Sequence, residues 1–124
     1  MNSKVAIGKP DIIVFQAGGN DLQDDISPIA LAHRIIGAGK QWSQSGATVA
    51  ISSVLPRADI QLNAKRWEVN LLLQGLCAAN NFHFIDNSKI TVKKHILKDG
   101  VHLNADGTFL FSDNLVSCLN LLSI

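Results

Sequence analysis

Charged residues are scarce in this sequence and are not clustered. They make up 17% of its 124 residues, against about 25% in typical soluble proteins, so the chain has much apolar surface to bury. The formal net charge is +1, and the lysines and arginines are scattered along the chain. No basic stripe is available to follow a phosphate backbone, so nucleic acid is not expected as a direct ligand.

Long apolar runs are also missing. The runs that exist are too short and interrupted to cross a bilayer, and segment 1–8 has no apolar stretch long enough for a signal peptide. The two cysteines, Cys77 and Cys118, each lie in a helical apolar pattern, which favours small buried side chains over a disulfide. We therefore expect no membrane association and a reduced, intracellular and cytoplasmic setting.

Short apolar runs alternate with longer amphipathic segments, a pattern typical of strand–helix crossover units. Residues 1–124 are long enough for one domain and contain no repeat or linker. The predicted strands cover 11–17, 47–54 and 82–86, and the predicted helices run from Ser27 to Gly46, over 61–80, and after a loop that contains residues 99–102. This order predicts an α/β fold of three α/β/α layers, with a flavodoxin-like parallel sheet and helices on both faces.

Each predicted helix has an apolar stripe at helical spacing that should face the core. The expected inward residues are Leu31, Ile35, Ala38 and Trp42 on the first helix, Val69, Leu72, Leu73, Leu76 and Cys77 on the second, and Phe111, Leu115, Leu119 and Leu122 on the last.

Two polar clusters fall at the carboxyl edge of the predicted sheet, where open parallel sheets bind ligands. Gly18-Gly19-Asn20-Asp21 follows the first strand, and Asp99-Gly100-Val101-His102 precedes the last helix. An asparagine amide can donate an N–H to an oxygen that becomes negative during acyl transfer. An aspartate near a histidine can accept the Nδ1–H and leave Nε2 free to take a proton. The candidate catalytic residues are therefore Asn20, Asp99 and His102, with Gly18 and Gly19 shaping the first loop.

These clusters resemble two conserved blocks of the SGNH (GDSL-type) hydrolases. The first is similar to the family's Gly-x-Asn-Asp block, whose asparagine helps to line the oxyanion hole, and the second to its Asp-x-x-His block, which supplies the acid and base of the triad. The resemblance extends over about residues 9–122, including 51–57 and 84–87, and it is especially marked for the esterase-like domains of metazoan retroelement-derived genes. It implies a small carboxylic ester or an acetylated sugar as substrate, and no cofactor.

The family's nucleophile block, Gly-Asp-Ser, has no counterpart here. It should lie upstream of the asparagine block, but residues 1–17 lack it, and Ser3 has no strand before it and no tight turn. We therefore expect an SGNH domain truncated at its N-terminus, with the nucleophile unknown. Esterase activity should be weak or absent, with His102 activating water and Asn20 stabilising the oxyanion.

Three alternatives stay open. The domain is a non-catalytic dimerisation or binding module derived from an esterase, a partner chain supplies a Gly-Asp-Ser segment, or the chain is a fragment of a longer esterase. Loss of the first strands would expose the strand at Ile12–Phe15, and an unprotected apolar edge favours association. We accordingly expect a homodimer or higher oligomer formed through this strand or the helices beside it.

Structural explanations also exist for these residues. Gly-Gly-Asn-Asp is common in turns, and an Asp99–His102 hydrogen bond can simply support a helix entrance. Zinc is not expected, because the possible ligands His83, His95, Asp99 and His102 match no known spacing. The remaining histidines, His33, His83 and His95, are expected at the surface or partly buried. Ser52 and Ser53 are expected to be polar residues at the end of a strand. Trp42 and Trp67 are expected in the core or in an interface.

Overall fold

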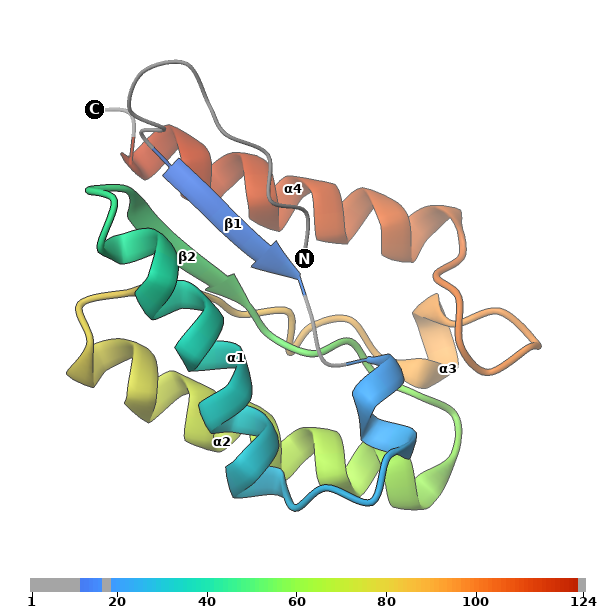
Figure 1. Cartoon of the computed structure of the whole chain (residues 1–124). Helices are drawn as coiled ribbons and strands as arrows, with labels where there is room; N and C mark the ends of the chain where they lie inside the picture. The colour runs from blue at the N-terminus through green and yellow to red at the C-terminus, as the bar shows by residue number, and fades with distance from the viewer. Residues whose placement is uncertain (1–11, 17–18, 123–124) are drawn as a thin grey trace.

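The structure is a computed structural model that describes residues 12–16 and 19–122. Its elements are β1 (Ile12–Gln16), η1 (Asn20–Gln23), α1 (Pro28–Ser43), β2 (Thr48–Ser52), α2 (Ile60–Ala79), β3 (His83–Ile85), α3 (Val92–His95) and α4 (Ala105–Leu122), as Figure 1 shows. All the predicted strands and main helices are present. The 3-10 turn η1 and the short helix α3 lie where the sequence had indicated only loops.

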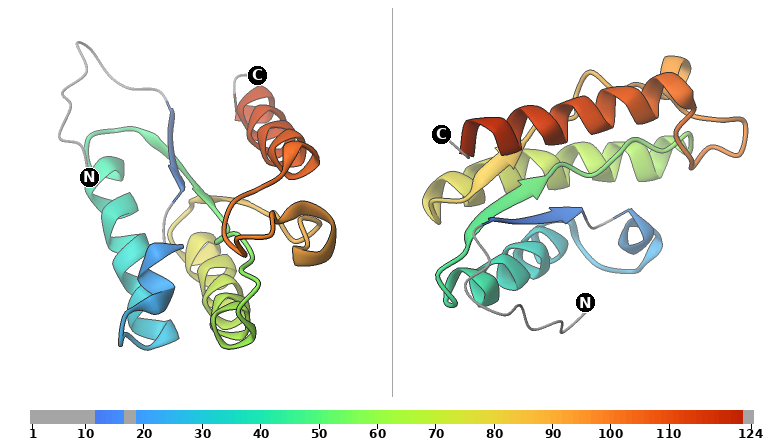
Figure 2. Two further views of the ribbon diagram at one scale, coloured as in Figure 1. Left: turned by 90° about the vertical axis from the view of Figure 1, so that its right-hand side faces the viewer. Right: turned by 90° about the horizontal axis from the view of Figure 1, so that it is seen from above.

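The strands form one parallel sheet in the order β1-β2-β3. Ile12 pairs with Thr48, and Ala50 pairs with His83, so β2 is the central strand. Both crossovers advance in the same direction across the sheet, and right-handed connections then place α1 and α2 on the same face. Helix α4 lies on the opposite face (Figure 2), so the predicted three-layer architecture is confirmed.

The helix boundaries follow from local side chains. Ser27 caps α1 by accepting a hydrogen bond from the Ala30 N–H at 3.2 Å, with Pro28 as the first helical residue. Gly46 follows α1 with a φ of 91°, a conformation that glycine adopts without steric cost. Asp59, which the sequence analysis did not single out, caps α2 through the Leu62 N–H at 3.0 Å.

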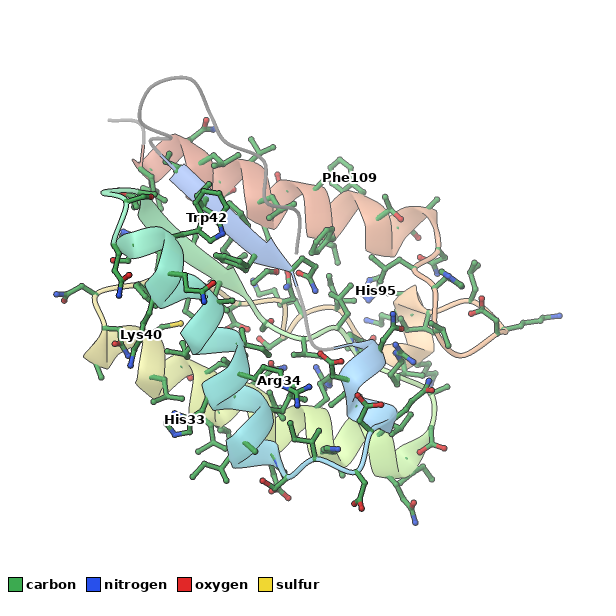
Figure 3. The ribbon with its side chains drawn as sticks, viewed as in Figure 1. His33, Arg34, Lys40, Trp42, His95 and Phe109 are labelled. Atoms are coloured by element: carbon green, nitrogen blue, oxygen red, sulfur yellow. The ribbon has the colours of Figure 1, made fainter. Side chains whose placement is uncertain are left out.

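The core lies between β2 and the α1–α2 layer. The predicted inward residues of α1 and α2 either belong to it or pack against it, and Figure 3 shows Trp42 among the latter. The fully or nearly buried members of these two stripes are Leu31, Ile35, Val69, Leu73 and Cys77.

The stripe predicted for α4 is only partly correct. Phe111, Leu115 and Leu122 are half-buried, but Leu119 is 37% exposed, and Gly107 is the only fully buried residue of this helix. The main contacts of α4 are with α3 and β3, so its apolar residues have less surface to cover than periodicity alone suggests. Within the described part of the chain, no helix combines the length and apolar character that a membrane span requires.

Candidate active site at the carboxyl edge

The predicted site residues come from loops at one end of the sheet. Figure 1 shows β1 and β2 pointing toward the end of the molecule that carries η1, α3 and the loop before α4. Asn20 is the first residue of η1, and Asp99 and His102 lie in the loop before α4. Gly18 falls outside the described residues. The remaining site residues therefore occupy the edge at which open parallel sheets bind ligands.

Asn20 is oriented by Arg57, a residue for which the sequence predicted no role in the site. Arg57 is only 6% exposed, and its Nη2 donates to Asn20 Oδ1 at 3.4 Å. A Cβ at Gly19 would lie 3.3 Å from the same nitrogen, so glycine gives the guanidinium room. Because the amide oxygen is held by Arg57, the Nδ2 group of Asn20 is the part left to donate to a ligand. The signal in the sequence was an arginine directly after a proline, in the loop that follows β2.

Asp99 and His102 form a pair within a short hairpin-like loop. An antiparallel bridge between Ile96 and Leu103 closes its base, and the Leu97 N–H donates to the His102 carbonyl at 2.8 Å. Within the loop, His102 Nδ1 lies 2.5 Å from Asp99 Oδ2. This contact leaves Nε2 facing away from the carboxylate, which is the arrangement that a general base needs.

The carboxylate of Asp99 is held by backbone groups as well. Its Oδ1 accepts the N–H groups of Val101 and His102, each at 2.9 Å. The pKa of Asp99 is lowered to about 2, first by the backbone hydrogen bond from residue 102 and then by the His102 side chain and the Val101 N–H. Asp99 is therefore ionised at neutral pH and is available to orient the imidazole.

The entrance of α4 does not explain the Asp99–His102 pair. Asn104 caps that helix: its Oδ1 accepts the Gly107 N–H at 2.8 Å, and its Nδ2 donates to the Lys94 carbonyl at 2.8 Å. Asp99 instead organises its own turn. A structural role for the pair therefore stays open, as a set of hydrogen bonds that orders the turn before α4 rather than as the cap of that helix.

One loop contacts both halves of the site. Arg57 bonds to Asn20, and the next residue, Ala58, donates its N–H to the Gly100 carbonyl at 3.0 Å. Gly100 has a φ of 77°, and a Cβ there would lie 3.0 Å from the Ala58 Cβ. Glycine is required at this position both by the left-handed backbone and by the close approach of the two loops. The segment after β2 therefore links the asparagine to the aspartate–histidine pair.

The pair is open to solvent. The side chain of His102 is 75% exposed and that of Asp99 is 45% exposed. Asn20, Asp99 and His102 do not line the two pockets described below, of about 210 and 260 Å³. The described residues thus provide an exposed acid–base pair and an amide donor at this edge.

The structure also places the other polar and aromatic residues that the sequence brought into consideration. His95 is buried, more deeply than predicted, and its Nδ1 accepts the N–H of Thr91, the residue before α3, at 2.8 Å. Ser52 and Ser53 are buried, and both of their hydroxyl oxygens contact the backbone or side chain of Asn87. Trp67 is exposed and so is not in the core, and the prediction that it lies in an interface stays a prediction. In residues 12–16 and 19–122, no three His, Cys, Asp or Glu side chains come together as a metal site would require.

Comparison with solved structures identifies the fold. The chain is similar to a GDSL-like lipase from Bacteroides thetaiotaomicron, with a TM-score of 0.78, 20% identity, and coverage of 90% of this chain and 62% of that one. It is also similar to a member of the lipolytic protein G-D-S-L family from Veillonella parvula, with a TM-score of 0.75, 20% identity, and coverage of 90% and 65%. The sequence matches no protein-family model. It also matches no curated protein.

The chain thus has the α/β fold of the GDSL-like lipases and spans less than two thirds of the length of these two structures.

Proposed function

We propose that this chain carries part of the catalytic site of an SGNH-type ester hydrolase. In this proposal His102 is the general base, Asp99 orients it, and Asn20 donates to the oxyanion. The observation that carries the proposal is the 2.5 Å contact between His102 Nδ1 and an Asp99 carboxylate that two backbone N–H groups already hold in place. The GDSL-like lipase fold supports the same reaction class.

Without a serine nucleophile, water is the attacking group. His102 Nε2 takes a proton from water as its oxygen adds to the ester carbonyl carbon, and Asn20 Nδ2 donates to the resulting oxyanion. Collapse of the tetrahedral intermediate expels the alkoxide, which takes the proton from His102. In serine proteases that lose a triad member, the remaining machinery still gives about 10³–10⁴-fold acceleration over water. We expect less here, because the pair is open to solvent and only one oxyanion donor is described.

Hydrolysis of p-nitrophenyl acetate tests this proposal. Exposed imidazoles react slowly with activated esters wherever they lie, so His102→Ala needs a matched control. His33→Ala removes an exposed histidine from α1, away from the carboxyl edge. We expect His102→Ala to remove most of the protein-dependent rate, and His33→Ala to change it little. Equal effects of the two variants would reject an active site at His102.

A fluorophosphonate probe identifies the attacking group. This reagent labels activated serines, and mass spectrometry of the treated protein locates the adduct. A rate that depends on His102 without any serine labelling indicates water as the nucleophile. Labelling that disappears in His102→Ala would instead identify a serine that the sequence did not reveal.

A second candidate function is assembly through β1. Within the described residues this strand pairs only with β2, so its other edge is open. Ile12, Ile13 and Val14 are only half-buried, and an open apolar edge favours association. We propose a homodimer formed through this strand. Light scattering at micromolar concentration should then give twice the chain mass, and Val14→Lys should lower that mass. A wild-type chain that is monomeric at this concentration would reject this function.

A further inference from the structure

The other edge strand of the sheet, β3, has unpaired backbone groups. The Ile85 carbonyl accepts the Ser53 N–H at 2.9 Å, so Ile85 directs its backbone groups toward β2. Successive residues of a strand direct these groups to opposite sides. The N–H and C=O of Phe84 therefore face away from β2, and among the described strands β3 has no second neighbour.

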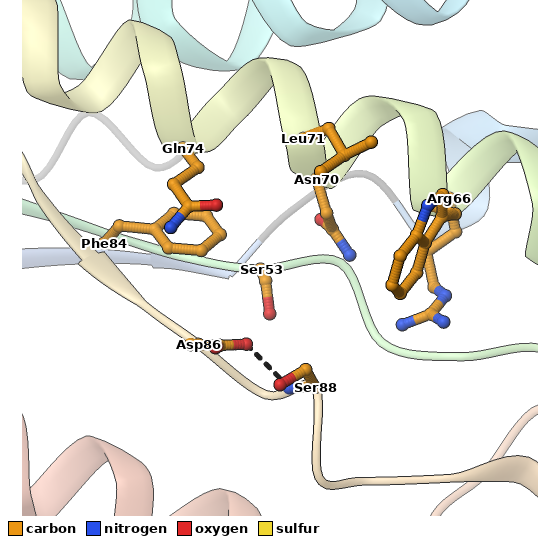
Figure 4. Close-up of a pocket in the computed structure, with 9 residues that line it drawn as sticks. Ser53, Arg66, Asn70, Leu71, Gln74, Phe84, Asp86 and Ser88 are labelled. Atoms are coloured by element: carbon orange, nitrogen blue, oxygen red, sulfur yellow. Dashed lines mark hydrogen bonds between the residues drawn. The ribbon is translucent and has the colours of Figure 1, made fainter.

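A pocket of about 210 Å³ adjoins this edge on the face covered by α2. We call it the α2-side pocket, and Figure 4 shows it between α2 and the end of β3. Its apolar part comes from Phe84 together with Trp67 and Leu71, two of the most exposed large apolar side chains of the molecule. The other lining residues are Ser53, Arg66, Asn70, Gln74, Asp86 and Ser88.

Arg66 gives the α2-side pocket an unsatisfied donor. Its Nε is buried, and it is the only buried side-chain nitrogen or oxygen in the described residues without a hydrogen-bond partner. Asp86 lines the same pocket, where its Oδ1 accepts the Ser88 N–H at 2.8 Å, and among the described residues it makes no ion pair with Arg66. Arg66 as a whole is only half-buried, but its Nε is shielded from water and has no acceptor among the described residues, so an incoming carboxylate would be favoured there.

A second pocket, of about 260 Å³, adjoins the same edge on the opposite face. We call it the α4-side pocket, because residues of α4 form one wall and β3 forms the other. Its α4 wall combines the apolar residues Cys118, Leu121 and Leu122 with the polar residues Asn114 and Ser117, and Leu121 is 72% exposed. Edge strand β3 therefore has a pocket with the Arg66 Nε donor on one face and a pocket with the exposed Leu121 side chain on the other.

We propose that β3 binds an extended peptide as an additional strand, with an acidic side chain in the α2-side pocket and an adjacent apolar side chain in the α4-side pocket. Main-chain bonds to Phe84 would supply affinity, and the two pockets would supply specificity. Successive side chains of a strand point to opposite faces, so neighbouring residues of the peptide reach the two pockets.

The dimensions of this edge favour a peptide over a second copy of the chain. β3 has three residues, and only Phe84 has both of its backbone groups directed outward. A stable protein–protein interface buries about 1,200–2,000 Å², far more than pairing of two such short strands contributes. A peptide needs only the edge and the two pockets. Its carboxylate also supplies the acceptor that Arg66 lacks.

Selection from a displayed library of random octapeptides tests the proposal with the full chain as bait. The enriched sequences should share an acidic residue next to an apolar one. For a selected peptide made synthetically with a fluorescent label, Arg66→Gln should weaken binding roughly tenfold or more, because hydrogen bonds to charged groups are the strong ones. Leu121→Glu should also weaken binding. Failure to enrich any such motif would overturn the proposal.

Matched controls separate the pockets from general surface effects. Arg34→Gln removes an exposed arginine from α1, and Val116→Glu adds a charge to α4 outside the α4-side pocket. Both should leave peptide binding unchanged, and circular dichroism checks that all variants are folded. On peptide binding, the Phe84 amide should exchange more slowly with solvent. An unchanged exchange rate of the Phe84 amide would contradict strand addition by a peptide. So would an equal loss of peptide binding in the control variants, or dimerisation of the chain through β3.

Discussion

The two faces of the sheet are stabilised in different ways. On the α1–α2 face, apolar side chains from distant segments are buried together, and Leu31, Val69 and Leu73 are 0% exposed. On the α4 face, an equally apolar helix buries only Gly107 completely, and Phe109 is 71% exposed (Figure 3). Order in this second region comes mainly from hydrogen bonds, many of them between near neighbours of segment 91–107. The candidate base thus belongs to the less buried region.

The largest difference between the two faces should appear in unfolding experiments. Leu73→Ala should lower the free energy of unfolding by about 2–5 kcal/mol, the usual range for a buried leucine that leaves a cavity. Val116→Ala on α4 should change it by less than about 0.5 kcal/mol, because exposed positions contribute little. Urea denaturation followed by circular dichroism measures both values. Similar losses of unfolding free energy in the two variants would mean that Val116 on α4 is buried to the same extent as the core residue Leu73.

An intermediate effect is expected where the two regions meet, at Gly100. Gly100→Ala forces a residue with a Cβ into a left-handed conformation, which costs about 1–2 kcal/mol, and brings that Cβ to 3.0 Å from Ala58. We expect the hairpin-like loop to open, so that the Leu97 amide, bonded to the His102 carbonyl, exchanges faster with solvent.

A double variant separates the two causes. Adding Ala58→Gly removes the contact but not the backbone strain, so it should restore only part of the Leu97 protection. Full protection in Gly100→Ala alone would show that the loop does not need glycine.

The smallest effect concerns the charge of Asp99. Its pKa of about 2 in the folded chain lies below the value of about 3.9 for an unfolded aspartate. Its stabilising contribution is therefore present above about pH 4 and is lost as the pH falls toward 2. Carbon-13 NMR of the carboxyl group should give this low midpoint. In His102→Ala the titration midpoint of Asp99 should rise but stay below 3.9, because the two backbone N–H groups still donate to the carboxylate. A midpoint at 3.9 in the wild type would contradict the observed hydrogen bonds.

The parts of the structure that sequence predicted correctly depend on local and periodic signals. Ser27 and Pro28 marked the start of α1, and the spacing of Val69, Leu73 and Cys77 identified the buried face of α2. The Asp-x-x-His spacing likewise indicated a pair that the structure brings into contact, since three residues suffice to form it. Such features can be predicted because no distant segment decides them.

Long-range packing determined what the sequence could not predict. The exposure of Leu119 depends on how much of the sheet α4 covers, and periodicity does not contain that information. The Arg57–Asn20 bond joins two loops that are distant in the chain, so neither residue's neighbours reveal it. Similarly, Ser52 and Ser53 lie at the end of β2 as predicted, but the sequence did not reveal that Asn87, from another segment, donates hydrogen bonds to both hydroxyl groups.

The agreement between strand order and chain order has a consequence for folding. β1 cannot pair before α1 and β2 have been made, and β3 cannot pair before α2. Closing loops of this length slows the formation of non-local contacts. During synthesis, each strand can therefore pair with its neighbour only after the helix between them has been translated. Helix α4 can dock only after the sheet has formed.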